Sequence, residues 1–439
     1  MQIKKYKNLL FTFVCLPLIS LAQQNTISPY SAFGIGEVQS QGFALNSEMG
    51  GLGLALRPNS NLNPMNPASL SALSVTSFEA GVNGSAMFLS DNTLSQEHFT
   101  STMSYLSLGF PITEGFAVSG GLLPYSFQGY EVSQNFNWAS DGDSLNYSVN
   151  HNGSGGLNRF YINFGVEVAK GLSVGATGSS VFGTLSQKRD LIFEDDYLLN
   201  RRDNNSYHVS DYTCDFGVQY QMDLEDKQLT FGATYSPQAN LSADNEGAIY
   251  TYDIVSGLAG GEGFVLESVR DTFKVFGSST NGLVLQKSYG LGLAMEKEDH
   301  WLISGEYDFK EWSQLSLFGS SEPQHRNASQ YKIGMWWIPN IQDVHNYLKT
   351  IQYRAGFNYN TGYLSVSALG SEGPQTEITD MSLSLGFGLP IKRSKTTANL
   401  GVQFGKRGTR DSGLIEEKYI KFHVAFTFND KWFTKRKID

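Results

Sequence analysis

The sequence repeatedly places an apolar or aromatic side chain at every second position over short segments. In the last of these segments, Ile420, Phe422, Val424, Phe426 and Phe428 alternate with polar or small residues. Successive side chains of a β-strand point to opposite faces, so this spacing produces one apolar face and one polar face. A strand between lipid and a polar lumen requires this pattern. Fourteen segments show it: 75–88, 102–112, 116–126, 158–168, 172–184, 210–222, 229–237, 287–295, 301–311, 329–337, 351–359, 379–389, 397–406 and 418–428.

The number and spacing of these segments favour a transmembrane β-barrel. Fourteen is an even number, and the segments approach the ~9–11 residues that a tilted membrane-spanning strand needs. Short connections, such as 169–171 and 223–228, alternate with long ones at 127–157, 185–209 and 238–286. Outer-membrane barrels have short turns in the periplasm and long loops outside. The sequence therefore predicts an all-β fold, a 14-stranded antiparallel barrel with both chain ends in the periplasm.

The composition excludes two other classes of protein. Aromatic residues make up 13% of the chain and charged residues 17%, whereas disordered chains are rich in charge and poor in aromatics. After residue 22 the chain has no run of ~18 apolar residues, which a membrane-spanning helix would need. A disordered chain and a bundle of membrane helices are therefore excluded.

The N-terminus indicates export from the cytoplasm. Three lysines precede an apolar stretch at 9–21, which is followed by the small residue Ala22, so we expect residues 1–22 to be a secretory signal peptide. The mature chain keeps one cysteine, Cys214, which forms neither an internal disulfide nor a thiolate metal site. The net charge of -10 argues against binding to nucleic acid. We expect the outer membrane of a Gram-negative bacterium as the location, with no cofactor and no metal.

Residues 23–74 do not alternate and are rich in Gly, Asn and Pro. The lumen of a fourteen-strand barrel is too wide for the side chains of the wall to fill. We therefore expect residues 23–74 to form a hatch inside the lumen, residues 75–428 to form the barrel, and residues 429–439 to form a periplasmic tail.

Two motifs and the strand count resemble the FadL-type family of outer-membrane transporters for long-chain fatty acids and other hydrophobic compounds. The motifs comprise the glycines of a Gly-Gly-Leu-Gly run and an Asn-Pro-Ala element: Gly50, Gly51, Gly53, Asn66, Pro67 and Ala68. The resemblance implies a hatch with the Asn-Pro-Ala element at its core. Barrels that accompany Bacteroidota-type secretion machines, such as the PorV-like proteins, look like the same class.

The segment 238–286 contains many apolar side chains, and an exposed apolar surface often marks a binding site. The resemblance implies that such a loop captures a hydrophobic ligand. The alternative is that these residues bind nothing and instead pack against neighbouring loops or extend the strands above the membrane. The candidate capture residues are Tyr250, Tyr252, Phe264, Phe273 and Phe276.

The predicted strands direct several charges into the lumen, among them Lys332 and Arg354. These two cations could hold a ligand carboxylate. The alternative is that they pair with other lumen charges and with the hatch, because buried polar groups need partners.

The third predicted strand contains Gly120, Gly121 and Pro124. Pro cannot donate a hydrogen bond to the neighbouring strand, so the alternation predicts a kink or bulge there. The resemblance implies that a kink in this strand opens a side window, through which hydrophobic ligand leaves into the membrane.

These features predict a monomeric barrel for passive uptake of hydrophobic, long-chain fatty-acid-like molecules, surrounded by outer-membrane lipids. The chain contains neither an HExxH nor a GxSxG motif, so we do not expect an enzyme. The alternative is an accessory of a type 9-like secretion machine that binds a partner protein. An apolar pocket continuous from loop to hatch would favour transport, and a solid polar lumen would favour the partner role.

Overall fold

The computed structural model describes most of the chain after the expected signal peptide. The described residues are 25–431 except 141–142, 196, 260–261, 281, 318–319, 322–323, 368–374 and 392–393. The expected signal peptide and most of the expected tail lie outside the described residues.

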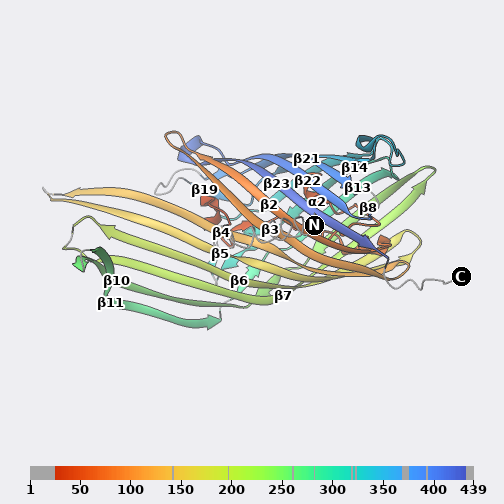
Figure 1. Ribbon diagram of the computed structural model, residues 1–439. Coiled ribbons are helices and arrows are strands. Elements are labelled where there is room, and N and C mark those ends of the chain that lie inside the picture. Colours follow the sequence, from red (N-terminus) through yellow and green to blue (C-terminus); the bar gives the residue numbers. More distant parts are fainter. Residues whose placement is uncertain are drawn as a thin grey trace, which may run out of the picture.

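The structure is a closed β-barrel of fourteen antiparallel strands, which confirms the predicted fold (Figure 1). Each predicted segment corresponds to one strand, and pairing between the first and the last strand closes the barrel. The strands are β2 (Thr76–Ser90), β3 (Ser95–Thr113), β4 (Phe116–Ser140), β5 (Asp143–Ala169), β6 (Leu172–Phe193), β7 (Asn200–Leu224), β8 (Lys227–Ser236), β13 (Ser288–Lys297), β14 (Trp301–Lys310), β17 (Ala328–Trp337), β18 (Gln352–Asn360), β21 (Asp380–Pro390), β22 (Thr397–Arg407) and β23 (Glu416–Asp430).

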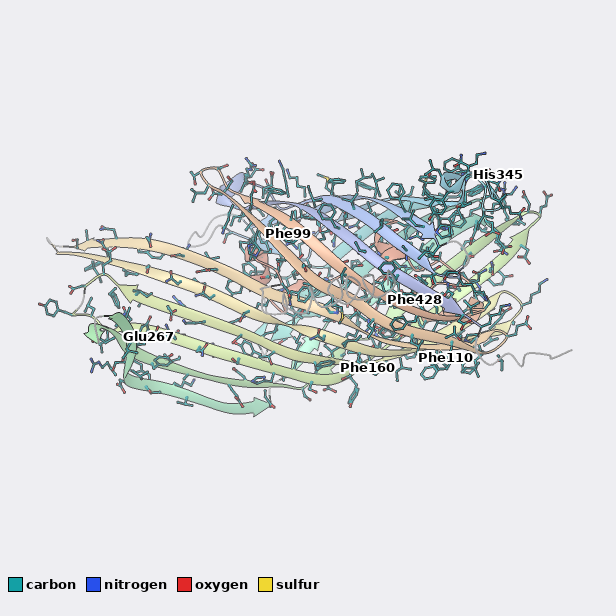
Figure 2. All side chains as sticks on the ribbon, viewed as in Figure 1. Phe99, Phe110, Phe160, Glu267, His345 and Phe428 are labelled. Carbon is teal, nitrogen blue, oxygen red and sulfur yellow. The ribbon has the colours of Figure 1, made fainter. Side chains whose placement is uncertain are left out.

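Alternation along the strands separates a lipid-facing surface from the lumen. On β21, Leu383 and Leu385 are exposed on the outer surface, whereas Ser382 and Ser384 are buried inside. Figure 2 shows Phe160 and other aromatic side chains on the outside of the barrel. This apolar outer surface is what a barrel in a bilayer requires.

Four strands continue far beyond the length that a membrane needs. Strands β4 to β7 have 22 to 27 residues each, whereas β8 and β14 have 10. Their extensions pair with one another, and β7 also pairs with β10 (Ala243–Ala259), which pairs with β11 (Glu262–Thr280). The result is a six-stranded sheet that projects from one end of the barrel (Figure 1). We call it the extracellular sheet, after the orientation that the lengths of the connections predict.

The extracellular sheet corrects the prediction of long loops at 127–157, 185–209 and 238–286. These segments are mainly strand, and hairpin turns are short. Both faces are exposed to water in their outer parts; for example, the consecutive residues Asn135, Phe136, Asn137 and Trp138 are all exposed on β4. Without lipid on one side, nothing imposes apolar alternation, so the pattern that identifies membrane strands is missing here.

The remaining elements are short. A small four-stranded sheet has the strand order β16-β15-β12-β9, and β19 pairs with β20. Within the described residues, no helix is long and apolar enough to span a membrane. The bounds are β1 (Glu37–Val38), β9 (Ala239–Leu241), β12 (Leu283–Leu285), β15 (Ser316–Leu317), β16 (Ser320–Ser321), β19 (Ser365–Val366), β20 (Thr376–Glu377), α2 (Ala44–Ser47) and the 3-10 helices η3 (Pro29–Ala32), η4 (Pro67–Ala72), η5 (Trp312–Gln314), η6 (Tyr347–Thr350) and η7 (Asp411–Gly413).

The two ends of the molecule can be distinguished by labelling. Figure 2 shows Glu267 of the extracellular sheet and His345 of a connecting turn at opposite ends of the molecule. In a Cys214→Ser background, Tyr197→Cys should react with a membrane-impermeant maleimide on intact cells, because Tyr197 is 95% exposed in the β6–β7 connection. Glu225→Cys, in the turn between β7 and β8, should react only after the outer membrane is permeabilised. The reverse result would invert the topology.

Candidate functional site

Residues 25–74, the hatch, are buried against the inner surface of the barrel. Asn66 is the N-cap residue of η4. Its Oδ1 accepts a hydrogen bond from the N–H of Ala68 at 3.1 Å, and its Nδ2 donates to the carbonyl of Leu54 at 2.7 Å. Pro67 occupies the first position of η4, where the missing N–H costs nothing. Asn66, Pro67 and Ala68 are all buried.

Glycines of the barrel wall make room for this element. Gly165, Gly175 and Gly217, on three neighbouring strands, face Pro67, Ala68 and Asn66 so closely that a Cβ atom would collide with them. A Cβ at Gly175 would lie 2.4 Å from the backbone nitrogen of Ala68. The lumen wall is therefore flat where the hatch backbone rests on it.

The Gly-rich run of the hatch surrounds a buried carboxylate. Glu306 of β14 accepts hydrogen bonds from the N–H groups of Gly53 at 2.8 Å, Leu54 at 2.6 Å and Ala55 at 3.2 Å. Gly50 and Gly51 precede this turn with φ values of +75° and +82°, which residues other than glycine rarely adopt. The run therefore binds an acidic group of the wall with its backbone.

Lys332 and Arg354 are paired within the protein. The Nζ of Lys332 lies 2.7 Å from Oδ2 of Asp308, and Nη1 of Arg354 lies 2.7 Å from Oε2 of Glu48. The side chains of Arg354 and Glu48 are 2% and 0% exposed. The structure thus follows the pairing alternative, and neither cation offers an unpaired charge to a ligand.

All three charged residues of the hatch form ion pairs with the wall. Between residues 25 and 74 the only charged residues are Glu37, Glu48 and Arg57. Glu37 pairs with Arg407 at 3.2 Å, and Arg57 pairs with Glu167 at 3.4 Å. These three hatch residues were not among the site residues predicted from the sequence. Their isolation in an otherwise uncharged segment was the signal that could have identified them.

Two cavities lie against opposite ends of the hatch, and both have mixed linings with many charged groups. The outer cavity has a volume of about 250 Å³ and is lined by polar and charged residues such as Lys310, Asp380 and Arg407 together with apolar and aromatic ones such as Trp312 and Leu364. The cavity on the periplasmic side has a volume of about 390 Å³ and a similar lining, including Arg57, Asn59, Gln221, Glu296 and Asp299. Neither forms an apolar path from the extracellular end to the hatch.

The three predicted kink residues of β4 differ in how they pair with the neighbouring strands. Gly120 and Gly121 pair with both neighbouring strands, so no gap occurs at these two glycines. Pairing of β3 with β4 ends at Leu122, and the register of β4 against β5 shifts between Pro124 and Ser126. Strand β1 of the hatch pairs with β4 just beyond this point. The wall therefore has no window at Gly120 and Gly121. An exit for ligand close to Pro124 stays a prediction.

The expected ligand-capture residues are on the outer part of the extracellular sheet, and two of them pack against Arg202. The guanidinium of Arg202 lies 4.5 Å from the ring centre of Tyr252 and 6.0 Å from that of Tyr250. Arg202 also donates a hydrogen bond to Glu267 at 2.9 Å. Hydrogen bonding to Arg202 lowers the pKa of the Glu267 carboxyl. Tyr250 and Tyr252 therefore hold β10 and β11 to the sheet, and their predicted part in capture is untested.

Strand β11 exposes four apolar side chains to water, on both faces of the strand. Leu266, Val269, Phe273 and Val275 are between 57% and 71% exposed. Phe273 is the one predicted capture residue whose described side chain is exposed. The side chains of Phe264 and Phe276 lie outside the described residues. We call these four exposed side chains the β11 patch.

Substitution of a wall glycine should loosen the hatch without unfolding the barrel. Gly175→Leu should drive a side chain into the backbone of Pro67 and Ala68, an overpacking that costs about 1–3 kcal/mol. Hydrogen exchange of residues 62–72 should become roughly ten- to hundredfold faster. Gly178→Leu is the matched control, because Gly178 lies on the same strand with no atom within 4 Å of its Cβ position. Equal hydrogen exchange of residues 62–72 in the two variants would show that the wall glycines do not hold the hatch in place.

Removal of one partner from the buried ion pair should cost more than removal of both. Arg354→Leu leaves Glu48 buried without its cation, which should lower the free energy of unfolding by about 3–5 kcal/mol. The double variant Arg354→Leu/Glu48→Leu should recover part of this loss, because no unpaired carboxylate remains. Denaturant titration of the four proteins of this cycle provides the measurement. Additive losses would show that the pair does not anchor the hatch.

Comparisons with known proteins agree with this architecture. Among solved structures, the CymD monoaromatic hydrocarbon channel is similar with a TM-score of 0.56 and 14% sequence identity, over 92% of this chain and 100% of that chain. The Ralstonia pickettii toluene transporter TbuX gives a TM-score of 0.54 and 14% identity, over 89% of this chain and 99% of that chain. A Pseudomonas aeruginosa FadL homologue gives 0.55 and 13%, over 90% of this chain and 100% of that chain.

At these identities the likeness establishes a shared FadL-type fold, as the sequence motifs predicted. No curated protein matches the chain. The model of one protein family, BamG, matches residues 2–439. The chain is therefore a member of the BamG family.

Proposed function

We propose that this protein acts in the outer membrane by binding a partner protein through its extracellular sheet, and that its barrel does not conduct hydrophobic compounds. The observation that carries this proposal is the polar lumen. Charged and amide side chains line much of both cavities beside the hatch, neither cavity is an apolar channel, and ion pairs join the hatch to the wall.

An apolar molecule gains little in such a lumen. Sites for small apolar ligands are lined predominantly by hydrophobic and aromatic side chains, because burial of apolar surface supplies most of the binding free energy. Movement of the hatch would also break the Arg354–Glu48 pair, both side chains of which are almost fully buried. Separation of a buried ion pair is strongly unfavourable. These terms favour a hatch that stays in place.

The extracellular sheet has the properties of a protein-binding surface. It rises beyond the membrane, so lipid does not cover the β11 patch, and exposed apolar groups of this kind mark interaction sites. Two charged residues, Glu267 and Arg270, lie between the apolar residues of the patch on β11. Protein interfaces combine apolar side chains with arginine and other polar groups. The partner would present a complementary apolar surface at the cell exterior.

Uptake of hydrophobic, long-chain fatty-acid-like compounds is the second candidate. Two observations favour it: the fold of the hydrocarbon channels and the seam above Leu122, where β3 and β4 no longer pair. A compound could enter the membrane through this seam without passing the whole lumen. Strand β1, which pairs with β4 at Ser126 and Phe127, would have to move first.

Removal of the β10–β11 hairpin separates the two functions. Asp244 pairs with Thr280, so a short Gly-Ser linker can replace residues 243–280 without strain on the barrel. A photo-crosslinking amino acid at Phe273 of the full-length protein should form one discrete protein adduct in living cells. The hairpin deletion should insert normally and abolish crosslinking to the same protein from a second probe at Tyr197, which is 95% exposed in the β6–β7 connection.

The controls decide between the candidates. A probe at Phe216, which is 47% exposed on the barrel surface, should give no such adduct. Proteoliposomes with the full-length protein should take up a radiolabelled fatty acid no faster than protein-free liposomes. Hatch-dependent uptake together with no adduct at Phe273 would contradict the partner proposal and support transport.

A further inference from the structure

The outer surface of the barrel has a cluster of cations at the extracellular ends of β22 and β23. Lys406, Arg410 and Lys418 surround a single carboxylate, Glu416, at 2.7, 3.3 and 3.5 Å. Their side chains are 41%, 45% and 57% exposed, whereas that of Glu416 is 10% exposed. The cluster therefore carries an excess of positive charge on a chain whose net charge is -10.

Lys406 and Lys418 are direct neighbours across two strands. Like charges at opposed positions of a ladder repel each other. One carboxylate shared among three cations neutralises only part of this charge. Asp91 and Asp411 lie in adjoining loops, where their carboxylates accept hydrogen bonds from Thr93 and Thr409. A further anion would therefore be stabilised between the two ammonium groups.

An apolar groove lies directly below the lysines on the membrane face. The strand register places Phe88, Lys418, Lys406 and Met381 in one row across β2, β23, β22 and β21. The next row toward the periplasm contains Ile420, Phe404, Leu383 and Phe357. These residues line a groove with a volume of about 490 Å³.

We propose that this groove binds a phosphate-bearing lipid of the outer leaflet, with an acyl chain along Phe404 and Leu383 and the phosphate between Lys406 and Lys418. Charge complementarity selects the head group, because clustered cations at a membrane surface attract anionic lipids. The groove accommodates the acyl chain, since aromatic and aliphatic side chains line it below the two lysines. The proposal is independent of the partner and transport functions above.

Native mass spectrometry of the purified full-length protein can test this site. The probe is monophosphorylated lipid A, and the same lipid after enzymatic dephosphorylation is the comparison. The wild type should bind the phosphorylated lipid at least tenfold more tightly. Lys406→Gln/Lys418→Gln should lose this preference. Lys188→Gln/Arg201→Gln, which removes two exposed cations of the extracellular sheet, should keep it.

Two further measurements identify which part of the lipid is bound. Millimolar inorganic phosphate should not displace the lipid, and Phe404→Ala should weaken lipid binding. Displacement by phosphate would mean a simple anion site and overturn the lipid proposal. Equal binding of both lipids, or unchanged binding by the double variant, would also overturn it. Heat-modifiable mobility on gels verifies the fold, and Lys418→Gln alone replaces the double variant if that fails to fold.

Discussion

The structure depends on the need to satisfy the buried backbone of the segment that fills the lumen. Residues 53–55 have no strand partner, so their N–H groups require acceptors from the wall. Glu306 supplies one carboxylate to three of them, and Lys332 lies opposite Glu306 in the ladder. A hydrogen-bonding requirement of the hatch thereby places charge on the wall, and that charge in turn requires counter-charges. The polar lumen follows from the irregular backbone inside it, and a polar lumen is poorly suited to hydrophobic cargo.

The strands of the barrel could be predicted because lipid imposes alternation on them. Each of the fourteen predicted segments corresponds to a strand, and β14 differs from its prediction by a single residue. The extracellular sheet could not be predicted in the same way. On β4, the consecutive residues from Asn135 to Trp138 are exposed, so both faces meet water there and polar residues such as Asn135 and Asn137 are as acceptable as apolar ones. Hydrogen bonds to neighbouring strands extend the sheet there, and the sequence of one strand does not reveal them.

The hatch shows a similar division between what the sequence reveals and what it does not. Its position and its Asn-Pro-Ala element could be predicted from composition and from the resemblance to FadL-type barrels. The contacts could not be, because an irregular segment has no period from which to derive its register against the wall. Arg354 was identifiable as a lumen cation, yet its partner Glu48 lies 306 positions earlier in the chain. The glycines at 165, 175 and 217 look like ordinary small lumen residues until the hatch backbone is placed on them.

The distribution of charged groups supports the proposal that this barrel recognises ligands at its outer surface. Inside the barrel, the cations Lys332, Arg354 and Arg407 each have a carboxylate partner. On the outside, three cations share Glu416, and the β11 patch exposes apolar side chains to water. Binding free energy comes from groups that gain partners on association, not from groups already paired. In this chain such groups are on the extracellular sheet and on the lipid-facing rim, so recognition is expected at the outer surface of the barrel.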